Sequence, residues 1–176
     1  MTMRRPVRIG VIGSAEATEL AARLARTIGT ALAHAEAVLV CGGRGGVMAA
    51  AAAGAAEEGG IVIGLLPGED AAGASSGVTI PIPTGLGDAR NTLVVRASEV
   101  LIAVTGGWGT LNEAALAMKL GRPLIGVHDS LGDAFNIERF SDPFAAVARA
   151  IELATEARLT GGPAVVRPRR PERQHL

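Results

Sequence analysis

The sequence predicts an α/β fold in which a single domain is built on a doubly wound parallel sheet. Short apolar runs alternate with helical segments along the chain, which is the order expected of β-α-β units. The apolar runs are continuous rather than alternating, as in strands covered on both faces of a parallel sheet. Glycine-rich turns follow three of these runs, at the edge where open α/β sheets bind ligands.

The first half of the chain predicts three strands and two helices. We expect strands over residues 7–13, 37–41 and 61–66, and helices over 18–34 and 46–58. Apolar residues recur at helical spacing in 18–34. Gly59-Gly60 stops the alanine-rich second helix, and Pro67-Gly68 closes the third strand. Residues 68–77 are rich in Gly, Ala, Ser and acids, which predicts a surface loop.

The second half continues the alternation. We expect strands over 78–83, 100–104 and 123–127, and helices over 88–98, 110–120 and 142–159. The prolines in 78–83 restrict that strand to an edge of the sheet, and Ser141-Asp142-Pro143 opens the last helix in good capping order. The prediction is therefore one domain over residues 1–160, followed by a flexible basic tail over 161–176.

Composition narrows the classes of function. Lys plus Arg (17) equals Asp plus Glu (17), so there is no general electrostatic attraction for nucleic acid. No apolar stretch is long enough to span a membrane and the N-terminal run does not fit a signal peptide. Cys41 is the single cysteine and the three histidines lack metal-ligand spacing. We expect a cytoplasmic protein without a metal site, and regard Cys41 as a small buried filler.

The three glycine-rich turns are residues 10–14 (GVIGS), 41–46 (CGGRGG) and 105–110 (TGGWGT). Glycine lets backbone N–H groups approach an anion, and the following helix N-terminus adds free N–H groups and partial positive charge. Glycines can also serve only to make tight turns, but three such turns at one sheet edge favour a phosphate site. They match neither a dinucleotide fingerprint nor a P-loop. The candidate binding residues are Gly13, Ser14, Gly42, Gly43, Arg44, Gly45, Gly106, Gly107, Gly109 and Thr110.

Two charged residues are candidates for chemistry at this edge. Glu113 lies one turn into the helix after the third glycine turn, where it could accept a proton or bind a sugar hydroxyl. Thr110-Leu-Asn-Glu113 also matches a capping box. Arg90 opens the helix over 88–98 and suits a phosphate, because its fork donates two parallel hydrogen bonds. A surface arginine paired with Asp88 is the alternative. Trp108 either stacks on a planar ring or simply packs.

These residues resemble a known family. Residues 105–113 (TGGWGTLNE) are similar to the PGGxGTxxE signature of the LOG, or lysine-decarboxylase-like, family, and residues 42–48 (GGRGGVM) resemble its GGGxxGLM turn. Arg90 has the spacing of the family's motif arginine. The resemblance runs from Val7 to Val127 and comes nearest to the short branch that includes molybdenum-cofactor carrier proteins. It implies a Rossmann-like fold and a homodimer or homotetramer, for which the alanine-rich helix over 46–58 is a candidate contact.

The resemblance leaves three functions open. The first is a binding protein for a phosphorylated nucleotide or pterin, with no required cofactor but with molybdenum cofactor or a nucleotide monophosphate as the bound molecule. The second is a phosphoribohydrolase that cleaves the N-glycosidic bond of nucleoside 5′-monophosphates with Arg90 and Glu113 as catalytic residues; lysine decarboxylation is not expected. The third is a nucleotide sensor. Thr105 stands where the signature has proline, and Asn91 where the hydrolases carry lysine, which counts against hydrolysis.

Overall fold

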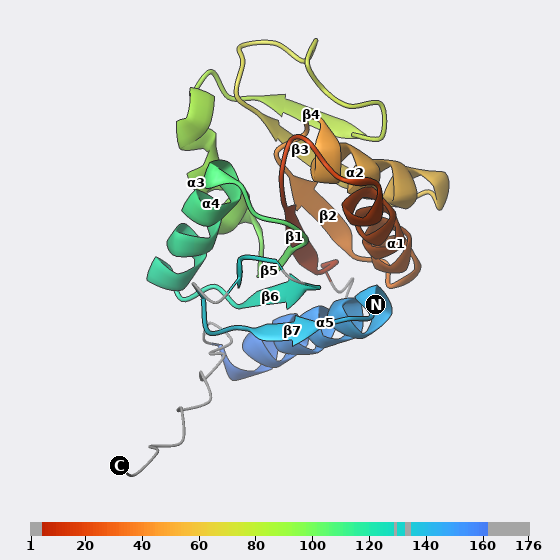
Figure 1. Ribbon diagram of the computed structural model, residues 1–176, viewed down its shortest axis with the longest axis vertical. Coiled ribbons are helices and arrows are strands. Elements are labelled where there is room, and N and C mark those ends of the chain that lie inside the picture. The colour runs from red at the N-terminus through yellow and green to blue at the C-terminus, as the bar shows by residue number, and fades with distance from the viewer. Residues whose placement is uncertain (1–4, 129, 133–134, 162–176) are drawn as a thin grey trace.

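In the computed structural model, which describes residues 5–128, 130–132 and 135–161, seven parallel strands form one sheet in the order β4-β3-β2-β1-β5-β6-β7 (Figure 1). The strands are β1 (Arg8–Ile12), β2 (Val38–Cys41), β3 (Val62–Leu66), β4 (Ile80–Pro83), β5 (Val100–Ala103), β6 (Leu124–Val127) and β7 (Glu138–Phe140). The helices are α1 (Glu19–His34), α2 (Gly46–Glu57), α3 (Asn91–Ala97), α4 (Trp108–Lys119) and α5 (Pro143–Thr160), with a 3₁₀ turn η1 (Gly87–Arg90) before α3. This is the Rossmann-like, doubly wound arrangement that the sequence predicted.

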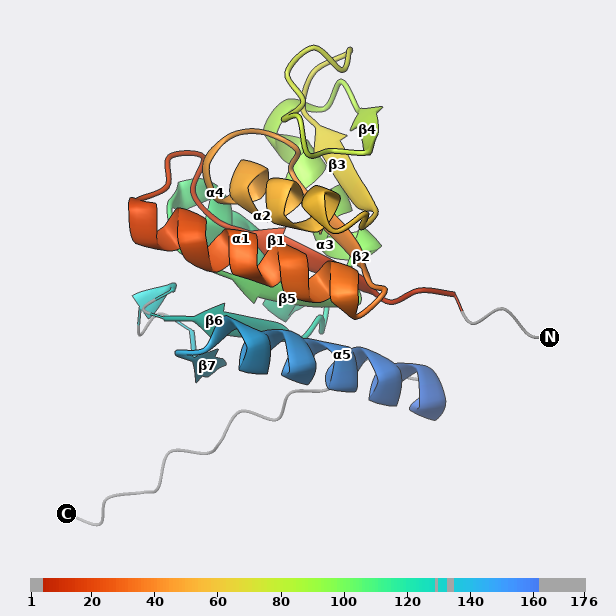
Figure 2. The same ribbon diagram turned by 90° about the vertical axis from the view of Figure 1, so that its right-hand side faces the viewer.

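Helices cover both faces of the sheet. Buried residues of α1, α2 and α5 pack on one face, and those of α3 and α4 pack on the other. Figure 2 shows α1, α2 and α5 in front of the sheet and α3 and α4 behind it. The inner strands β1, β2, β5 and β6 are almost wholly buried, as their continuous apolar runs predicted.

The order in which strands are added to the sheet reverses at β1. Gly10 of β1 lies opposite Val40 of β2 on one side and Leu101 of β5 on the other. Strands β2 to β4 are therefore added on one side of β1, and strands β5 to β7 are added on its other side. Open α/β sheets bind ligands outside the carboxyl ends of the strands at such a switch point.

The predicted elements agree with the structure except at two places, the helix expected over 88–98 and strand β7. β4 is an edge strand, as Pro81 and Pro83 predicted. The helix expected over 88–98 is divided into η1 and α3. Strand β7 was not predicted, because Glu138-Arg139-Phe140 is short, charged and paired on one side only. The basic tail predicted for 161–176 lies, apart from Gly161, outside the described residues.

Helix α2 is alanine-rich because α1 approaches it closely. A methyl group on Gly29 of α1 would lie 2.8 Å from the backbone nitrogen of Ala55, and one on Gly54 of α2 would lie 2.9 Å from the carbonyl carbon of Arg26. Small residues on both helices thus permit contact within the chain, so the alanines of α2 need no second chain to explain them. None of the helices in the described part of the chain has the length and apolar character needed to cross a bilayer.

Candidate functional site

The three glycine-rich turns are joined at the carboxyl edge of the sheet. Ser14, which follows β1, donates its backbone N–H to Oγ1 of Thr105, which follows β5, at 3.2 Å. The carbonyl of Ser14 accepts from the N–H of Val47, at the start of α2, at 3.0 Å. The structure therefore brings the turns after β1, β2 and β5 together at the switch point.

Two helices that leave these turns begin without a side-chain cap. Gly45 is the N-cap of α2 and Gly107 is the N-cap of α4, and neither helix has a side-chain cap hydrogen bond. By contrast, Thr18 caps α1 and Asp142 caps α5 through their side chains. A helix start leaves its first N–H groups without intrahelical partners. At α2 the N–H of Val47 already donates to Ser14, so the start of α4 and the remaining N–H groups at the start of α2 are the donors that an anion can accept from.

The glycines of the second turn have two different structural roles. Gly43 and Gly46 have φ angles of 70° and 61°, a left-handed conformation that glycine adopts without strain; here the tight-turn interpretation holds. Gly42 instead permits a close approach. A methyl group on Gly42 would lie 2.6 Å from Cζ of Arg90, so only glycine leaves room for the guanidinium at the end of β2.

Arg90 is a buried cation in this position. The residue is 9% exposed, and its Nε is buried with no hydrogen-bond partner among the described residues. Burial lowers the pKa of Arg90, and the Glu113 carboxylate partly offsets that shift. The guanidinium remains charged, because an arginine is effectively always protonated. A charged side chain with one unpartnered donor, its Nε, is thus held beside the glycine turns.

Glu113 faces Arg90 from α4. Its Oε1 lies 4.0 Å from Nη1 of Arg90, which is an ion pair but too long for a hydrogen bond. Glu113 is 7% exposed, and burial raises the pKa of its carboxyl to about 7, while Arg90 acts to lower it. The carboxyl group can therefore exchange a proton near neutral pH.

Two alternative interpretations from the sequence are wrong. The capping box fails because α4 begins at Trp108, which places Thr110 inside the first turn and Glu113 deeper in the helix. Oγ1 of Thr110 is instead buried without a hydrogen-bond partner in the described part of the chain. The surface pairing of Arg90 with Asp88 fails because Arg90 is buried and pairs with Glu113.

The remaining candidates are placed as follows. Trp108 is 88% exposed, so it does not pack into the core. Arg44 is exposed on the second glycine turn. Cys41 is fully buried, and burial raises the pKa of its thiol to about 11, as suits a filler rather than a nucleophile. The described residues contain no group of three or more His, Cys, Asp or Glu side chains that could hold a metal ion.

Several hollows lie at this edge, among them a pocket of about 170 Å³ beside Thr105 and Gly106. A groove of about 540 Å³ lies along α3 and α4, beside Trp108, Asn91 and Asn112. In it, Nδ2 of Asn91 donates to Oδ1 of Asn112 at 3.2 Å, a contact that no sequence pattern indicates. A second pocket, of about 260 Å³, lies past the end of β3 and is called here the Arg44 pocket. It is lined by Arg44, Leu66, Pro67, Gly68, Asp70 and Gly73.

A Rossmann-like sheet with uncapped helix starts and a buried arginine at its switch point defines a class of α/β proteins suited to binding anions. Within that class, the sequence profile of the SLOG cluster4 family matches residues 6–155. The chain therefore belongs to the SLOG cluster4 family.

Solved structures similar to this chain include a molybdenum cofactor carrier protein and a molybdenum cofactor binding protein. The molybdenum cofactor carrier protein of Chlamydomonas reinhardtii is 37% identical, with a TM-score of 0.76 over 86% of this chain and 99% of that chain. The molybdenum cofactor binding protein of the phototrophic bacterium Rippkaea orientalis is 37% identical, with a TM-score of 0.70 over 93% of this chain and 90% of that chain. A protein of Archaeoglobus fulgidus is 42% identical over 116 residues, which are 66% of this chain and 76% of that protein.

Proposed function

We propose that this protein binds a phosphorylated pterin or nucleotide without transforming it, and that molybdenum cofactor is the first candidate. The observation that carries the proposal is Arg90, a buried guanidinium that lies against Gly42 with its Nε unpartnered among the described residues. The similarity to molybdenum cofactor carrier and binding proteins supports the same choice of ligand.

Two buried polar atoms without hydrogen-bond partners favour the binding of an anion at this site. Nε of Arg90 and Oγ1 of Thr110 are both buried without a partner in the described residues. A buried group left in this state costs about 1–3 kcal/mol, and more if it is charged. A phosphate offers acceptors to both. Because both atoms are closed off from solvent, binding requires a small rotation of these side chains.

The chemistry of the donors fits the organic part of the cofactor. Backbone N–H groups of α2 and α4, together with Arg90, suit a phosphate. Cys41 is a poor ligand for molybdenum, because burial disfavours its thiolate. In this proposal the cofactor is cargo, held through its phosphate and its pterin ring.

The Arg90–Glu113 pair favours a second candidate, a phosphoribohydrolase of nucleoside 5′-monophosphates. Glu113, with a pKa of about 7, would hold the ribose hydroxyls or assist water as positive charge develops on the sugar. Arg90 would orient the nucleotide and favour departure of the base. Asn91 counts against this candidate, because it supplies no cation and its amide is bonded to Asn112. A nucleotide sensor is the third candidate, with the same pocket and no turnover.

One pair of assays separates the candidates. The purified protein is analysed for a bound fluorescent pterin, and is incubated with AMP and related monophosphates. A co-purifying pterin without release of free base supports the carrier. Release of base that Glu113→Ala and Arg90→Ala both abolish supports the hydrolase and overturns our first choice. Nucleotide binding with neither result leaves the sensor.

We also propose a cytoplasmic homodimer or homotetramer. The exposed Trp108 and Met118, both on α4, are apolar surface that an oligomer would cover. Size-exclusion chromatography with light scattering tests this: a mass near 17.8 kDa, that of a single chain, would contradict it.

A further inference from the structure

The Arg44 pocket is a formed hollow beside the glycine turns. Its floor is the end of β3, and its wall is the loop that begins at Pro67. Hydrogen bonds hold this loop in place: Gly85 donates its N–H to the carbonyl of Gly68 at 2.9 Å, and Gly87 donates to that of Pro67 at 3.0 Å. Ser75, farther along, donates to the carbonyl of Gly43 at 2.9 Å. The pocket is therefore fixed to both the second glycine turn and the segment that carries Arg90.

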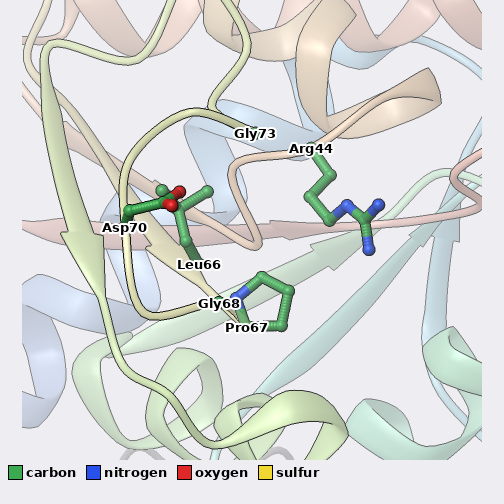
Figure 3. A pocket seen from close by; sticks show the side chains of 6 residues that line it. All are labelled: Arg44, Leu66, Pro67, Gly68, Asp70 and Gly73. Atoms are coloured by element: carbon green, nitrogen blue, oxygen red, sulfur yellow. The ribbon is translucent and has the colours of Figure 1, made fainter.

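The pocket has an apolar floor between two charged side chains. Figure 3 shows Asp70 and Arg44 on opposite sides, with Leu66 and Pro67 between them. Oδ1 of Asp70 accepts from the N–H of Ala72 at 3.0 Å, which orients the carboxylate and leaves acceptor capacity on both oxygens. Across the described residues, the Arg44 guanidinium takes part in no hydrogen bond or ion pair.

The distance from the switch point suits a phosphorylated nucleoside or pterin. The Arg44 pocket lies past β3, while the switch point lies between β1 and β5. Adjacent strands are about 4.8 Å apart, so these places are separated by roughly 10–14 Å across the sheet edge. Arg90 lies against Gly42 at the end of β2, one strand from the pocket, so this distance applies to a phosphate at the turns after β1 and β5. A ligand whose phosphate contacts those two turns can therefore place its ring against Arg44.

We propose that the Arg44 pocket binds the heterocyclic ring of the ligand, and that it selects a 2-amino-4-oxopyrimidine edge, as found in guanine and in pterins. This inference rests on the proposed function. A guanidinium stacks well on a planar ring, and the apolar floor covers the rest of the ring. The edge of such a ring presents two neighbouring N–H donors, which pair with the two oxygens of the Asp70 carboxylate. Adenine does not present that pair of donors.

The groove beside Trp108 is the competing place for the ring. Its amide side chains Asn91 and Asn112 are bonded to each other, and its charged lining residue, Asp88, has no cation among the other lining residues. The Arg44 pocket instead offers an uncommitted cation. The observations thus favour the Arg44 pocket.

The test uses three probes: GMP, AMP and ribose 5-phosphate. Isothermal titration calorimetry measures their affinities for the wild type, Asp70→Asn and Arg44→Ala. Glu69→Gln is the matched control, because it removes the same charge one residue away and does not line the pocket. We expect the wild type to prefer GMP to AMP by roughly 10- to 100-fold, the range of one good bidentate contact to a base edge. Asp70→Asn should abolish that preference and leave ribose 5-phosphate unchanged. Arg44→Ala should weaken both nucleotides more than it weakens ribose 5-phosphate.

Two results would overturn the inference while the proposed function stands. One is equal affinity for GMP and AMP in the wild type. The other is loss of nucleotide affinity in Trp108→Leu but not in Arg44→Ala, which would place the ring in the groove. If ribose 5-phosphate and both nucleotides fail to bind and no pterin co-purifies, the proposed function itself is overturned.

Discussion

Gly42→Ala isolates the contact on which the proposed site depends. The added methyl group would lie 2.6 Å from Cζ of Arg90, whereas carbon atoms in contact prefer about 3.5–4.0 Å. The guanidinium must therefore move by roughly 1 Å. Gly42 is not among the glycines with positive φ, so alanine fits the backbone and the perturbation acts through Arg90.

The displaced guanidinium should lose one charge-assisted hydrogen bond to the phosphate. Such a bond contributes about 1.5–3 kcal/mol, which corresponds to a loss of affinity of roughly 10- to 150-fold. Calorimetric titration with ribose 5-phosphate measures this in the wild type, Gly42→Ala, Arg90→Ala and the double variant. If the reasoning is correct, Gly42→Ala has no further effect once Arg90 is absent. Equal losses in both backgrounds would show that Gly42 acts independently of Arg90, and would refute the argument.

Three other substitutions follow from the same structure. Thr110→Val removes a buried hydroxyl that has no partner in the described residues, so it should stabilise the ligand-free protein by about 1–3 kcal/mol in urea unfolding while weakening phosphate binding; a fall in both would contradict this. Because burial raises the pKa of Glu113 from 4.5 to about 7, the folded state holds this proton more tightly, and wild-type stability should decline as pH rises from 4.5 to 7. Glu113→Gln should remove that decline and should be more stable than the wild type at pH 8 by on the order of 3 kcal/mol. Free energies of unfolding that change with pH in the same way in both proteins would contradict this expectation. Gly29→Ala should destabilise the protein by about 1–3 kcal/mol through overpacking of α1 against α2 without changing ligand affinity, and an unchanged melting temperature would speak against that close contact.

The fold was predictable because buried parallel strands carry a strong signal. The apolar runs that became β1, β2, β5 and β6 are continuous, and glycine or proline marks the ends of several. β7 lacks that signal, since an edge strand of three residues buries little. Its place in the sheet depends on pairing with β6, which no local pattern encodes.

The sequence indicated candidate residues for the site but not the contacts between them. The resemblance in motifs indicated both Arg90 and Glu113, and the structure places them face to face. Spacing alone was misleading for Thr110, because the capping-box pattern does not reveal that Gly107 starts the helix earlier. The approach of Arg90 to Gly42 joins segments that are distant in sequence, so only the folded chain shows it.

Backbone amide signals provide the most direct test of an anion site in the glycine turns. Nitrogen-15 NMR spectra of the full chain are recorded during titration with ribose 5-phosphate and, in parallel, with ribose. We predict that the amides of Gly42, Gly107 and Gly109 shift with the phosphate compound and not with the sugar. If ribose 5-phosphate shifts only amides elsewhere in the chain, the phosphate does not bind at these turns and the central claim is wrong.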